Sequence, residues 1–256
     1  MKVVILAGGL GSRLSEATVT VPKPMVEIGG KPILWHIMKI YSHFGFNEFI
    51  ICCGYKQYVI KEYFANYFHH NCDMTVDLSN NSIHILDNHS ENWKVTMVDT
   101  GLQTLTGGRI KRISQYIGNE PFLLTYGDGV ADVNIQQIIS SHKVSGKYLT
   151  MTAFQPVGRL GVLNISTDGL VQSFEEKPSE SGTWINAGFF VCEPEIFNYL
   201  KGDYEMFEKE PMQQIIQDQQ LHAFKHTGFW KPMDTLRDNT ELNELWNNGK
   251  APWKIW

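Results

Sequence analysis

The chain has 256 residues, of which 43% are hydrophobic and 19% charged, and its formal net charge at pH 7 is -5. This length suits one large domain, or one domain with a terminal extension, and the apolar content suffices for a substantial core. The negative net charge argues against nucleic acid or an anionic membrane as a partner, because both favour a basic protein surface.

The distribution of apolar residues and cysteines indicates a cytoplasmic protein. The apolar N-terminus is interrupted at Gly8, too early for the core of a signal peptide, and no stretch approaches the roughly 20 apolar residues of a membrane span. The four cysteines, at positions 52, 53, 72 and 192, show the spacing of neither a metal site nor a disulfide framework. We therefore expect reduced thiols in a reducing compartment.

The first predicted strand and the loop after it form the most distinctive stretch of the chain. Residues 3–7 are a continuous apolar run, typical of a buried strand in a parallel sheet. Gly8, Gly9 and Gly11 follow directly, where glycines allow a positive φ and a close approach to a ligand. Successive backbone amides in such a loop form a concavity for anionic oxygens, and the guanidinium of Arg13 matches phosphate geometry. This stretch therefore predicts a phosphate-binding loop.

A lysine held between two prolines follows the loop. Lys23 lies between Pro22 and Pro24, so its backbone is extended and its ammonium is presented from a stiff segment. The loop lacks the Gly-Lys-Ser/Thr ending of a mononucleotide P-loop, and Leu14 stands where a dinucleotide-binding loop has its third glycine. A plain strand-to-helix turn is the alternative, but the coincidence of glycines, arginine and lysine favours phosphate binding.

The rest of the chain predicts alternating strands and helices, followed by a strand-rich second half. Helical patterns cover residues 33–44 (with Pro32 in the first turn and Gly45 at the end), 59–68, 106–117, 135–143 (capped near Asp132 or Asn134), 211–219 and 235–246. Strand patterns cover residues 49–53, 95–98, 121–126, 148–154, 161–165, 170–175 and 185–192, and residues 69–98 include a protruding hairpin that turns at Asn80–Asn81. We expect an α/β fold, a Rossmann-like, mostly parallel sheet with helices on both faces and ligands beyond the carboxyl ends of its strands.

Two aspartates are candidates for the chemistry. Asp128 follows the apolar run 122–126 between two glycines, so it can face a ligand at the end of a strand or belong to a solvated Gly-Asp-Gly turn. Asp234 immediately precedes a predicted helix, where a plain N-cap is the alternative interpretation. Position alone does not decide between these alternatives.

Basic and amide side chains supply further candidates. Lys177 ends a strand before Pro178, and its alternative is a surface lysine paired with a neighbouring glutamate. Asn186 can bind a sugar hydroxyl or satisfy a turn, and Gly188 would allow a hexose to approach the backbone. Arg109 begins a helical pattern, where an exposed arginine would oppose the helix dipole, which favours an anionic partner.

Several segments resemble the nucleoside-diphosphate-sugar pyrophosphorylases. They are LAGGLGSRL, PKPMVEIGGKPILWHIM, FIICCGYK, DTG with TGGR, TYGDGVAD, FEEKP, INAGFFV, and FWKPMDTLRD through GKAPWKIW. The resemblance runs from Met1 to Trp256 and preserves the order of the motifs. Two departures are conservative in volume, since Ser12 stands where the family often has threonine and Ala187 where it often has glycine.

The resemblance implies a single nucleotidyltransferase domain with a glycosyltransferase-A-like fold over residues 1–256. It implies a nucleotide-binding half at 1–130, a sugar-phosphate-binding half at 131–234, and a C-terminal helix and tail at 235–256. The extended forms of several motifs imply CTP and α-D-glucose 1-phosphate as substrates, CDP-glucose as product, and Mg²⁺ as cofactor.

The resemblance also assigns roles to particular residues. It places Mg²⁺ on Asp128 and Asp234, and catalysis on Arg13, Lys23 and Asp128. It assigns sugar-phosphate binding to Glu176, Lys177, Asn186 and Gly188. Nucleotide binding falls to Leu6, Ala7, Gly8, Gly9, Leu10, Gly11, Ser12, Arg13, Lys23, Thr104 and Arg109.

Three alternatives remain open at this point. The enzyme can use another nucleoside triphosphate or another sugar 1-phosphate in the same chemistry. A dinucleotide-dependent oxidoreductase is disfavoured by Leu14 and the two prolines. A non-catalytic binding protein on the same fold is disfavoured because the charged site residues are present. The resemblance further implies a symmetric homo-oligomer, with a hexamer as a candidate and residues 69–92 and the tryptophan-rich tail as contacts.

Overall fold

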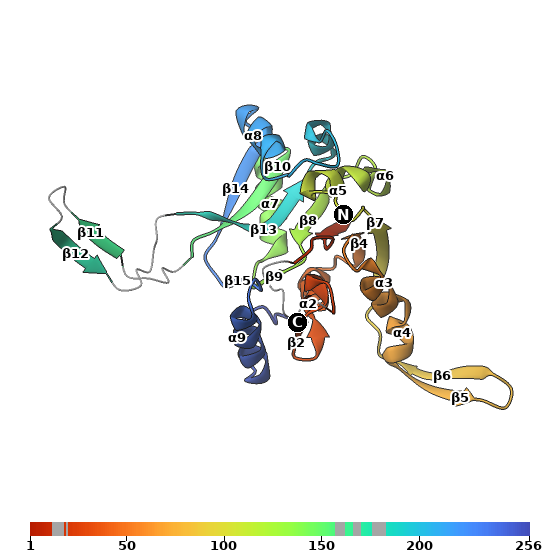
Figure 1. Cartoon of the computed structure of the whole chain (residues 1–256). Coiled ribbons are helices and arrows are strands. Elements are labelled where there is room, and N and C mark those ends of the chain that lie inside the picture. The colour runs from red at the N-terminus through yellow and green to blue at the C-terminus, as the bar shows by residue number, and fades with distance from the viewer. Residues whose placement is uncertain (12–17, 19, 157–161, 166–169, 176–182) are drawn as a thin grey trace.

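A seven-stranded mixed sheet forms the centre of the molecule (Figure 1). The computed structural model describes residues 1–11, 18, 20–156, 162–165, 170–175 and 183–256. In spatial order the strands are β14 (Leu221–His226), β10 (Leu149–Phe154), β13 (Ile185–Cys192), β8 (Phe122–Tyr126), β1 (Val3–Leu6), β4 (Glu48–Cys53) and β7 (Lys94–Asp99).

The sheet is mostly parallel, which confirms the predicted α/β class. β8, β1, β4 and β7 run parallel to one another, as do β10 and β14, whereas β13 is antiparallel to both of its neighbours. β14 was not predicted, because its sequence LHAFKH mixes apolar and basic residues without clear alternation. It lies at the edge of the sheet, where a strand needs less apolar surface.

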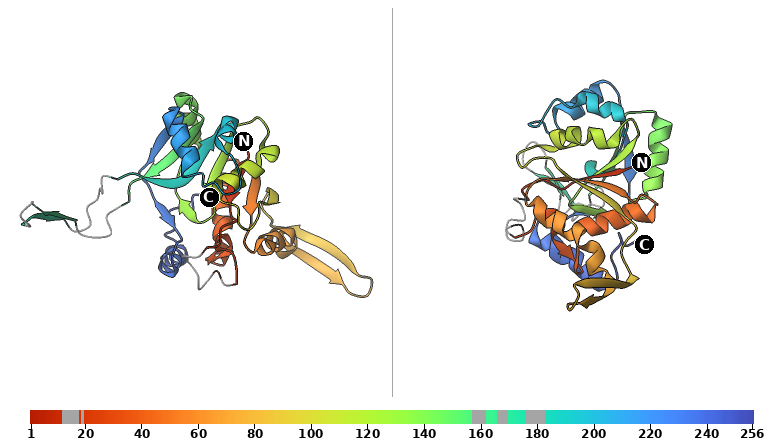
Figure 2. Two further views of the ribbon diagram at one scale, coloured as in Figure 1. Left: turned by 45° about the horizontal axis from the view of Figure 1, so that its top comes forward. Right: turned by 90° about the vertical axis from the view of Figure 1, so that its right-hand side faces the viewer.

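Helices cover both faces of the sheet, as predicted (Figure 2). Alternate residues of β1 enter opposite cores: Val3 and Ile5 join one cluster, while Val4 and Leu6 join the other. The first cluster includes α2 (Ile33–His43) and α7 (Ile135–Ser145); the second includes α5 (Thr106–Arg112), α6 (Ser114–Ile117), α8 (Glu210–Gln217) and the 3₁₀ helix η3 (Pro194–Tyr199).

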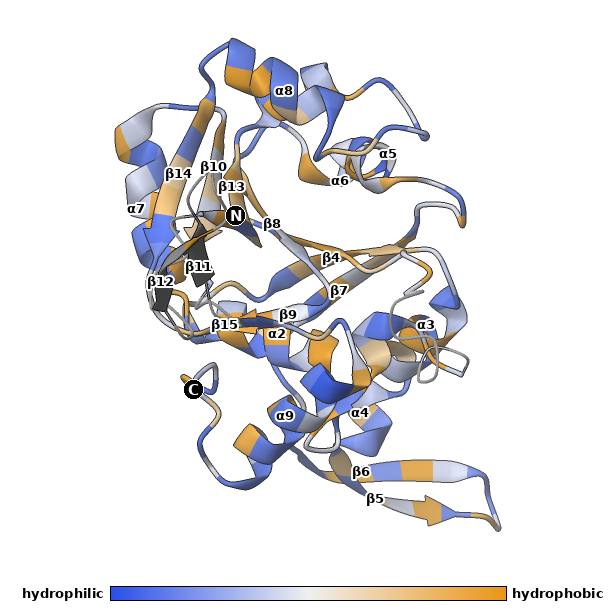
Figure 3. Cartoon of the chain, turned by 60° about the vertical axis from the view of Figure 1, so that its left-hand side comes forward, coloured by the Kyte–Doolittle hydropathy of each residue, from blue (hydrophilic) through white to orange (hydrophobic). Residues whose placement is uncertain are grey.

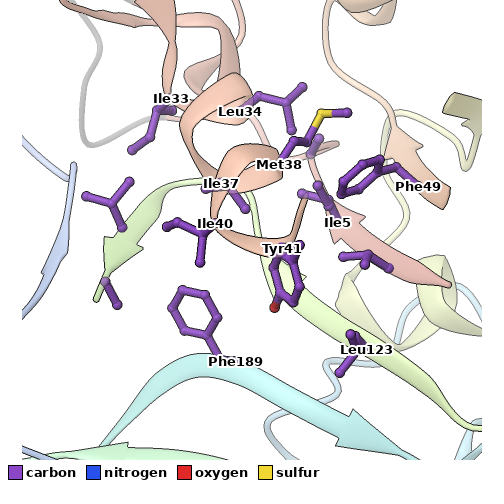
Figure 4. Packing of buried hydrophobic residues seen from close by; sticks show 14 of the residues in the cluster. Ile5, Ile33, Leu34, Ile37, Met38, Ile40, Tyr41, Phe49, Leu123 and Phe189 are labelled. Carbon is purple, nitrogen blue, oxygen red and sulfur yellow. The ribbon is translucent and has the colours of Figure 1, made fainter. Parts of the chain in front are cut away.

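α2 packs against the sheet through a row of buried apolar residues (Figure 4). Its buried residues Ile37 and Tyr41 lie one turn apart on the face that meets Ile5, Leu123 and Phe189 of the sheet. Pro32 is the N-cap of α2 rather than part of its first turn. Of the two predicted caps of α7, the structure confirms Asn134, whose side chain accepts from Gln137 N at 3.0 Å.

The predicted protruding hairpin is confirmed, and it lies beyond two short helices (Figure 1). The single helix expected at 59–68 is divided into α3 (Gln57–Ala65) and α4 (Tyr67–His70), which lead into β5 (Cys72–Asp77) and β6 (Ser82–Asn88). Apolar residues occur along both strands of this ribbon (Figure 3). Most of its surface faces solvent, and Leu78 in its turn is 83% exposed. A second ribbon pairs β11 (Val162–Ile165) with β12 (Val171–Glu175).

Five short elements were not predicted from the sequence and lie near the carboxyl ends of the central strands. A 3₁₀ turn, η2 (Lys23–Met25), precedes the paired β2 (Glu27–Ile28) and β3 (Lys31–Pro32). β9 (Gly129–Ala131) pairs antiparallel with β15 (Trp230–Pro232), just before α9 (Leu236–Asn247). Strands of two or three residues are too short to leave a period in the sequence.

Two further predictions can be compared with the described residues. Cys52, Cys53 and Cys192 are buried, as expected for thiols that act as small apolar side chains, and all four cysteines are free. Within the described parts of the chain, no helix has the length and apolar character needed to cross a bilayer.

The C-terminal tail is anchored to α2 through a buried histidine. His36 Nε2 donates to the carbonyl oxygen of Ile28 at 2.8 Å, and Trp253 Nε1 donates to His36 Nδ1 at 3.3 Å. These partners require a neutral ring with its proton on Nε2. Burial lowers the pKa of His36 to about 4, so the folded protein resists its protonation.

This histidine predicts a loss of stability in mild acid. Below the ordinary pKa of 6.5, the unfolded chain binds a proton that the folded chain refuses until about pH 4. The free energy of unfolding should therefore fall by about 2 kcal/mol between pH 7 and pH 5 from this group alone. His36→Gln can keep both hydrogen bonds without titrating, so denaturant unfolding at the two pH values should show a correspondingly smaller difference. An unchanged pH dependence in the variant would contradict the assignment.

Candidate active site

The glycine loop lies at the carboxyl end of β1, against the end of β4. Ala7 N donates to Cys52 O at 3.1 Å, and Tyr55 N donates to Gly8 O at 3.1 Å. A Cβ on Gly54 would come within 2.6 Å of Gly8 O, so the two backbones approach more closely than side chains would permit. The loop is thus held on the rim of the sheet, where the sequence analysis expected a ligand.

Arg109 lies beneath this loop rather than on the surface. It is 4% exposed, and its guanidinium donates to the carbonyl oxygens of Gly8 at 2.9 Å, Gly101 at 2.8 Å and Cys53 at 3.2 Å, and to Thr100 Oγ1 at 2.7 Å. Burial lowers the pKa of Arg109, but an arginine keeps its charge in proteins. The interpretation as an exposed helix-start arginine is wrong. These three backbone carbonyl oxygens thus accept from one buried guanidinium. Arg109 thereby connects the loop after β1, the end of β4 and the loop after β7.

The two glycines of the Thr-Gly-Gly-Arg motif allow the backbone of residues 203–207 to pack directly against the start of α5. A Cβ on Gly107 would come within 2.8 Å of Glu205 O, and one on Gly108 within 2.5 Å of Asp203 Cα. Gly107 N donates to Glu205 O at 2.9 Å. This close contact brings Met206 into the wall of the site, and no local sequence pattern predicts that placement.

Lys23 lies between the two candidate aspartates. Its Nζ donates to Asp128 Oδ2 at 2.7 Å and to Asp234 Oδ1 at 2.6 Å. Burial by itself would lower the pKa of Lys23, but the two carboxylates outweigh it and the pKa lies above its ordinary value. The side chain therefore carries a full positive charge in a site with two carboxylates.

The unpredicted pair β9–β15 brings the two aspartates together. Gly129 is in register with Pro232, and Met233 N donates to Asp128 O at 2.8 Å, so Asp128 and Asp234 flank the same end of this short sheet. The N-cap of α9 is Thr235, not Asp234. This excludes the plain N-cap role for Asp234 and leaves its carboxylate directed to Lys23.

A cavity of about 350 Å³ unites these groups at the carboxyl ends of β1 and β8. Ten of the predicted site residues line it: Leu6, Ala7, Gly8, Gly9, Gly11, Lys23, Thr104, Arg109, Asp128 and Asp234. Leu10 does not line the cavity, and the residue is 53% exposed to solvent. The lining also includes residues that the sequence analysis did not select: Pro24, Leu105, Thr106, Tyr126, Gly127 and Met206.

Asn186 and Gly188 lie behind one wall of the cavity, next to Tyr126. Asn186 Nδ2 donates to Tyr126 Oη at 3.3 Å, and Gly188 N donates to Asn186 Oδ1 at 2.8 Å. Gly188 has φ +79°, and a Cβ there would come within 2.4 Å of Tyr126 Cδ2. The glycine therefore makes room for the tyrosine ring, and the close approach of a hexose that we expected at Gly188 stays a prediction.

Other predicted site residues lie outside the described residues. These are Ser12, Arg13, Glu176 and Lys177, whose assigned roles stay predictions.

The donor set fits magnesium better than a transition metal. Over the described residues there is no group of three or more His, Cys, Asp or Glu that could enclose an ion. Asp128 and Asp234 instead offer two converging carboxylates beside a cavity. Magnesium prefers such an open site, with one or two carboxylates supplemented by substrate phosphate oxygens.

Comparison with known proteins defines the class of the chain. The family model described as nucleotidyl transferase matches residues 2–247, so the chain belongs to the nucleotidyl transferase family. The glucose-1-phosphate cytidylyltransferase of Salmonella typhi is 56% identical over 257 residues, covering 100% of both chains. The probable glucose-1-phosphate cytidylyltransferase of Bacillus subtilis is 47% identical over the same full coverage.

Solved structures agree with this membership. HddC from Yersinia pseudotuberculosis superimposes with a TM-score of 0.68 at 26% identity, covering 96% of this chain and 99% of that one. A UDP-glucose pyrophosphorylase complexed with UDP-glucose gives a TM-score of 0.69 at 17% identity, covering 97% and 98%, a likeness of fold alone. The fold is therefore that of nucleotidyltransferase pyrophosphorylases, as expected.

Proposed function

We propose that this enzyme makes CDP-glucose and diphosphate from CTP and α-D-glucose 1-phosphate. The carrying observation is that Lys23 and two aspartates converge in a cavity beside a glycine loop, in a chain 56% identical over its full length to a glucose-1-phosphate cytidylyltransferase. A glycine loop with a fixed cation suits a triphosphate, and the paired carboxylates suit a metal bound to it.

The reaction requires positioning and charge stabilisation rather than a covalent enzyme intermediate. An oxygen of the sugar phosphate attacks the α-phosphorus of CTP in line, and a new P–O bond forms. The bond from the α-phosphorus to the bridging oxygen breaks, and its electron pair leaves with diphosphate. The attacking oxygen is already ionised, so no general base is needed, and fixed donors stabilise the charge that develops.

Asp128 and Asp234 would hold Mg²⁺, because their carboxylates already converge on one cation. A bound Mg²⁺ would neutralise phosphate charge and orient the reacting groups. The ammonium of Lys23 would then turn from the carboxylates to the phosphate oxygens of the nucleotide. This exchange conserves local charge balance, since the carboxylates have a cationic partner both before and after the substrate enters.

The remaining predicted residues complete the proposal. Amides of Gly8 to Gly11 would hold the nucleotide phosphates together with Arg13, and Arg109 would keep that loop in place from below. Lys177 would contact the sugar phosphate, and Glu176 and Asn186 the sugar hydroxyls. The division into nucleotide-binding and sugar-phosphate-binding halves stands as part of the proposal.

The nucleotide is the most direct test of this function. With glucose 1-phosphate and Mg²⁺ held constant, kcat/KM for CTP should exceed that for UTP, dTTP, ATP and GTP by at least about tenfold. Cytosine carries an amino donor where uracil and thymine carry a carbonyl oxygen, and the purines differ from it in size. A coupled assay of diphosphate release measures this preference. A preference for another triphosphate would contradict the assignment of CTP and indicate a different nucleotide substrate within the same family. A panel of sugar 1-phosphates, assayed with CTP, tests the second substrate in the same way.

Removing the convergent charges should slow turnover without unfolding the enzyme. Lys23→Ala or Asp128→Asn is expected to lower kcat by about 10² to 10³, the usual effect of losing an electrostatic stabiliser. Lys143→Ala changes an exposed lysine on α7 and serves as the matched control. Steady-state kinetics and circular dichroism together decide the case, and near-normal turnover in both site variants would remove them from the mechanism.

We also propose that the enzyme is a cytoplasmic homo-oligomer, with a hexamer as a candidate, in contact through the β5–β6 ribbon. Its exposed apolar residues Val76, Leu78 and Leu86 support this, because soluble proteins rarely leave several large apolar side chains of one short ribbon uncovered. The four free thiols and the triphosphate substrate support the location.

Shortening this ribbon should yield monomers. Replacement of residues 74–86 by a short Gly-Ser turn removes apolar surface that packs on neither core, so the fold should persist. Sedimentation velocity measures the outcome. An assembly of unchanged subunit number would refute the contact.

A further inference from the structure

Glu208 connects two walls of the cavity from behind. Thr106 Oγ1 donates to Glu208 Oε2 at 2.6 Å, and Tyr126 Oη donates to Glu208 Oε1 at 2.7 Å. Thr106 begins α5, and Tyr126 ends β8; both line the cavity. Glu208 itself follows the segment that carries Met206, so one carboxylate joins three separate parts of the chain.

The chain of hydrogen bonds continues from Glu208 to the predicted sugar-binding side. A carboxylate only accepts, so the phenol of Tyr126 must donate to it and can then only accept from Asn186. Burial raises the pKa of Tyr126, as does the charge of Glu208, which keeps the phenolic proton in place.

This direction of donation fixes the amide of Asn186. Its nitrogen must face Tyr126, because the phenolic hydroxyl already donates its proton in the hydrogen bond to Glu208 and can only accept from Asn186. Its oxygen faces the amide of Gly188. Within the described residues, one N–H of the amide stays outside these contacts, so Asn186 can offer a donor to a ligand, while the second lone pair of its oxygen can still accept.

The small contribution of the Glu208 hydrogen bonds to the free energy of folding indicates that this carboxylate has a role beyond stability. Glu208 is half-buried, and within the described residues its carboxylate is met by two neutral hydroxyls rather than by a cation. A half-buried carboxylate that loses part of its hydration and gains only two neutral donors contributes little net free energy to folding. Thr106 is in addition fixed by Phe207 N, which donates to its hydroxyl at 2.9 Å. The network is therefore rigid on the nucleotide side.

We propose that Glu208 is a positioning residue for the sugar 1-phosphate, acting through Tyr126 to present an N–H of Asn186 to a hexose hydroxyl. This inference rests on the proposed function. It requires that hydroxyl to act as an acceptor. It also requires Tyr126 and Glu208 to work as one unit, since Glu208 orients the phenolic hydroxyl and that hydroxyl holds the nitrogen of Asn186 in place.

The test separates the two substrates in steady-state kinetics. Glu208→Ala and Tyr126→Phe should each raise the KM for glucose 1-phosphate about tenfold, equivalent to about 1.4 kcal/mol, while the KM for CTP changes less than about threefold. The double variant should be no worse than either single variant, because the two side chains act in series. Glu208→Gln, which keeps one acceptor oxygen, should recover part of the loss.

Controls keep the outcome decisive. Glu210→Ala alters an exposed glutamate two positions away, which pairs with Lys201, and should leave both KM values unchanged. Thermal unfolding of each variant shows whether it folds. If Glu208→Ala does not fold, the double-mutant cycle is measured with Tyr126→Phe and Glu208→Gln instead. Equal increases in both KM values, or additive effects in the double variant, would overturn the inference.

The wild-type enzyme is assayed first, so failure of the proposed function is recognised separately. If it uses a different sugar 1-phosphate, the substrate assignment fails, while the cycle is measured with that sugar phosphate under the same criteria.

Discussion

The site depends on one ammonium placed between two carboxylates. Asp128 and Asp234 are held side by side by the β9–β15 pair, and like charges so close in a cavity repel strongly unless a cation lies between them. Lys23 supplies that cation from a segment stiffened by prolines on both sides. The folded site is therefore arranged for a positive charge before any substrate arrives, which is the electrostatic requirement of phosphoryl chemistry.

The surrounding structure holds this arrangement through close backbone contacts. Arg109 donates to carbonyl oxygens of three loops, and the absence of side chains at Gly8 and Gly54 leaves room for its guanidinium. Hydrogen bonds from a charged donor to buried carbonyls are stronger than neutral ones and satisfy groups that would otherwise be costly to bury. Arg109 therefore satisfies these buried carbonyl oxygens while it holds the backbone at the carboxyl ends of the strands in place.

The sequence predicted the parts of the fold that leave a local signal. The apolar run of β1, the glycine loop and the ribbon at 69–98 follow from composition and period, and Lys23 was selected because prolines flank it. The neighbours of Asp128 left it undecided between a ligand-facing carboxylate and a solvated turn, and the resemblance alone selected it. It did not predict that Arg109 is buried, because its carbonyl partners come from three distant loops. Nor did it predict Met206 and Glu208, which reach the site only through contacts at Gly107 and Gly108. Such placements depend on tertiary contacts between segments far apart in the chain.

The most direct measurement is a crystal structure of the enzyme with a non-hydrolysable CTP analogue and Mn²⁺, with the metal located by its anomalous scattering. The account predicts one peak coordinated by both Asp128 and Asp234, with the Lys23 ammonium moved from the carboxylates to a phosphate oxygen. A metal bound away from these aspartates, or a Lys23 that keeps both carboxylate contacts beside the bound nucleotide, would contradict it.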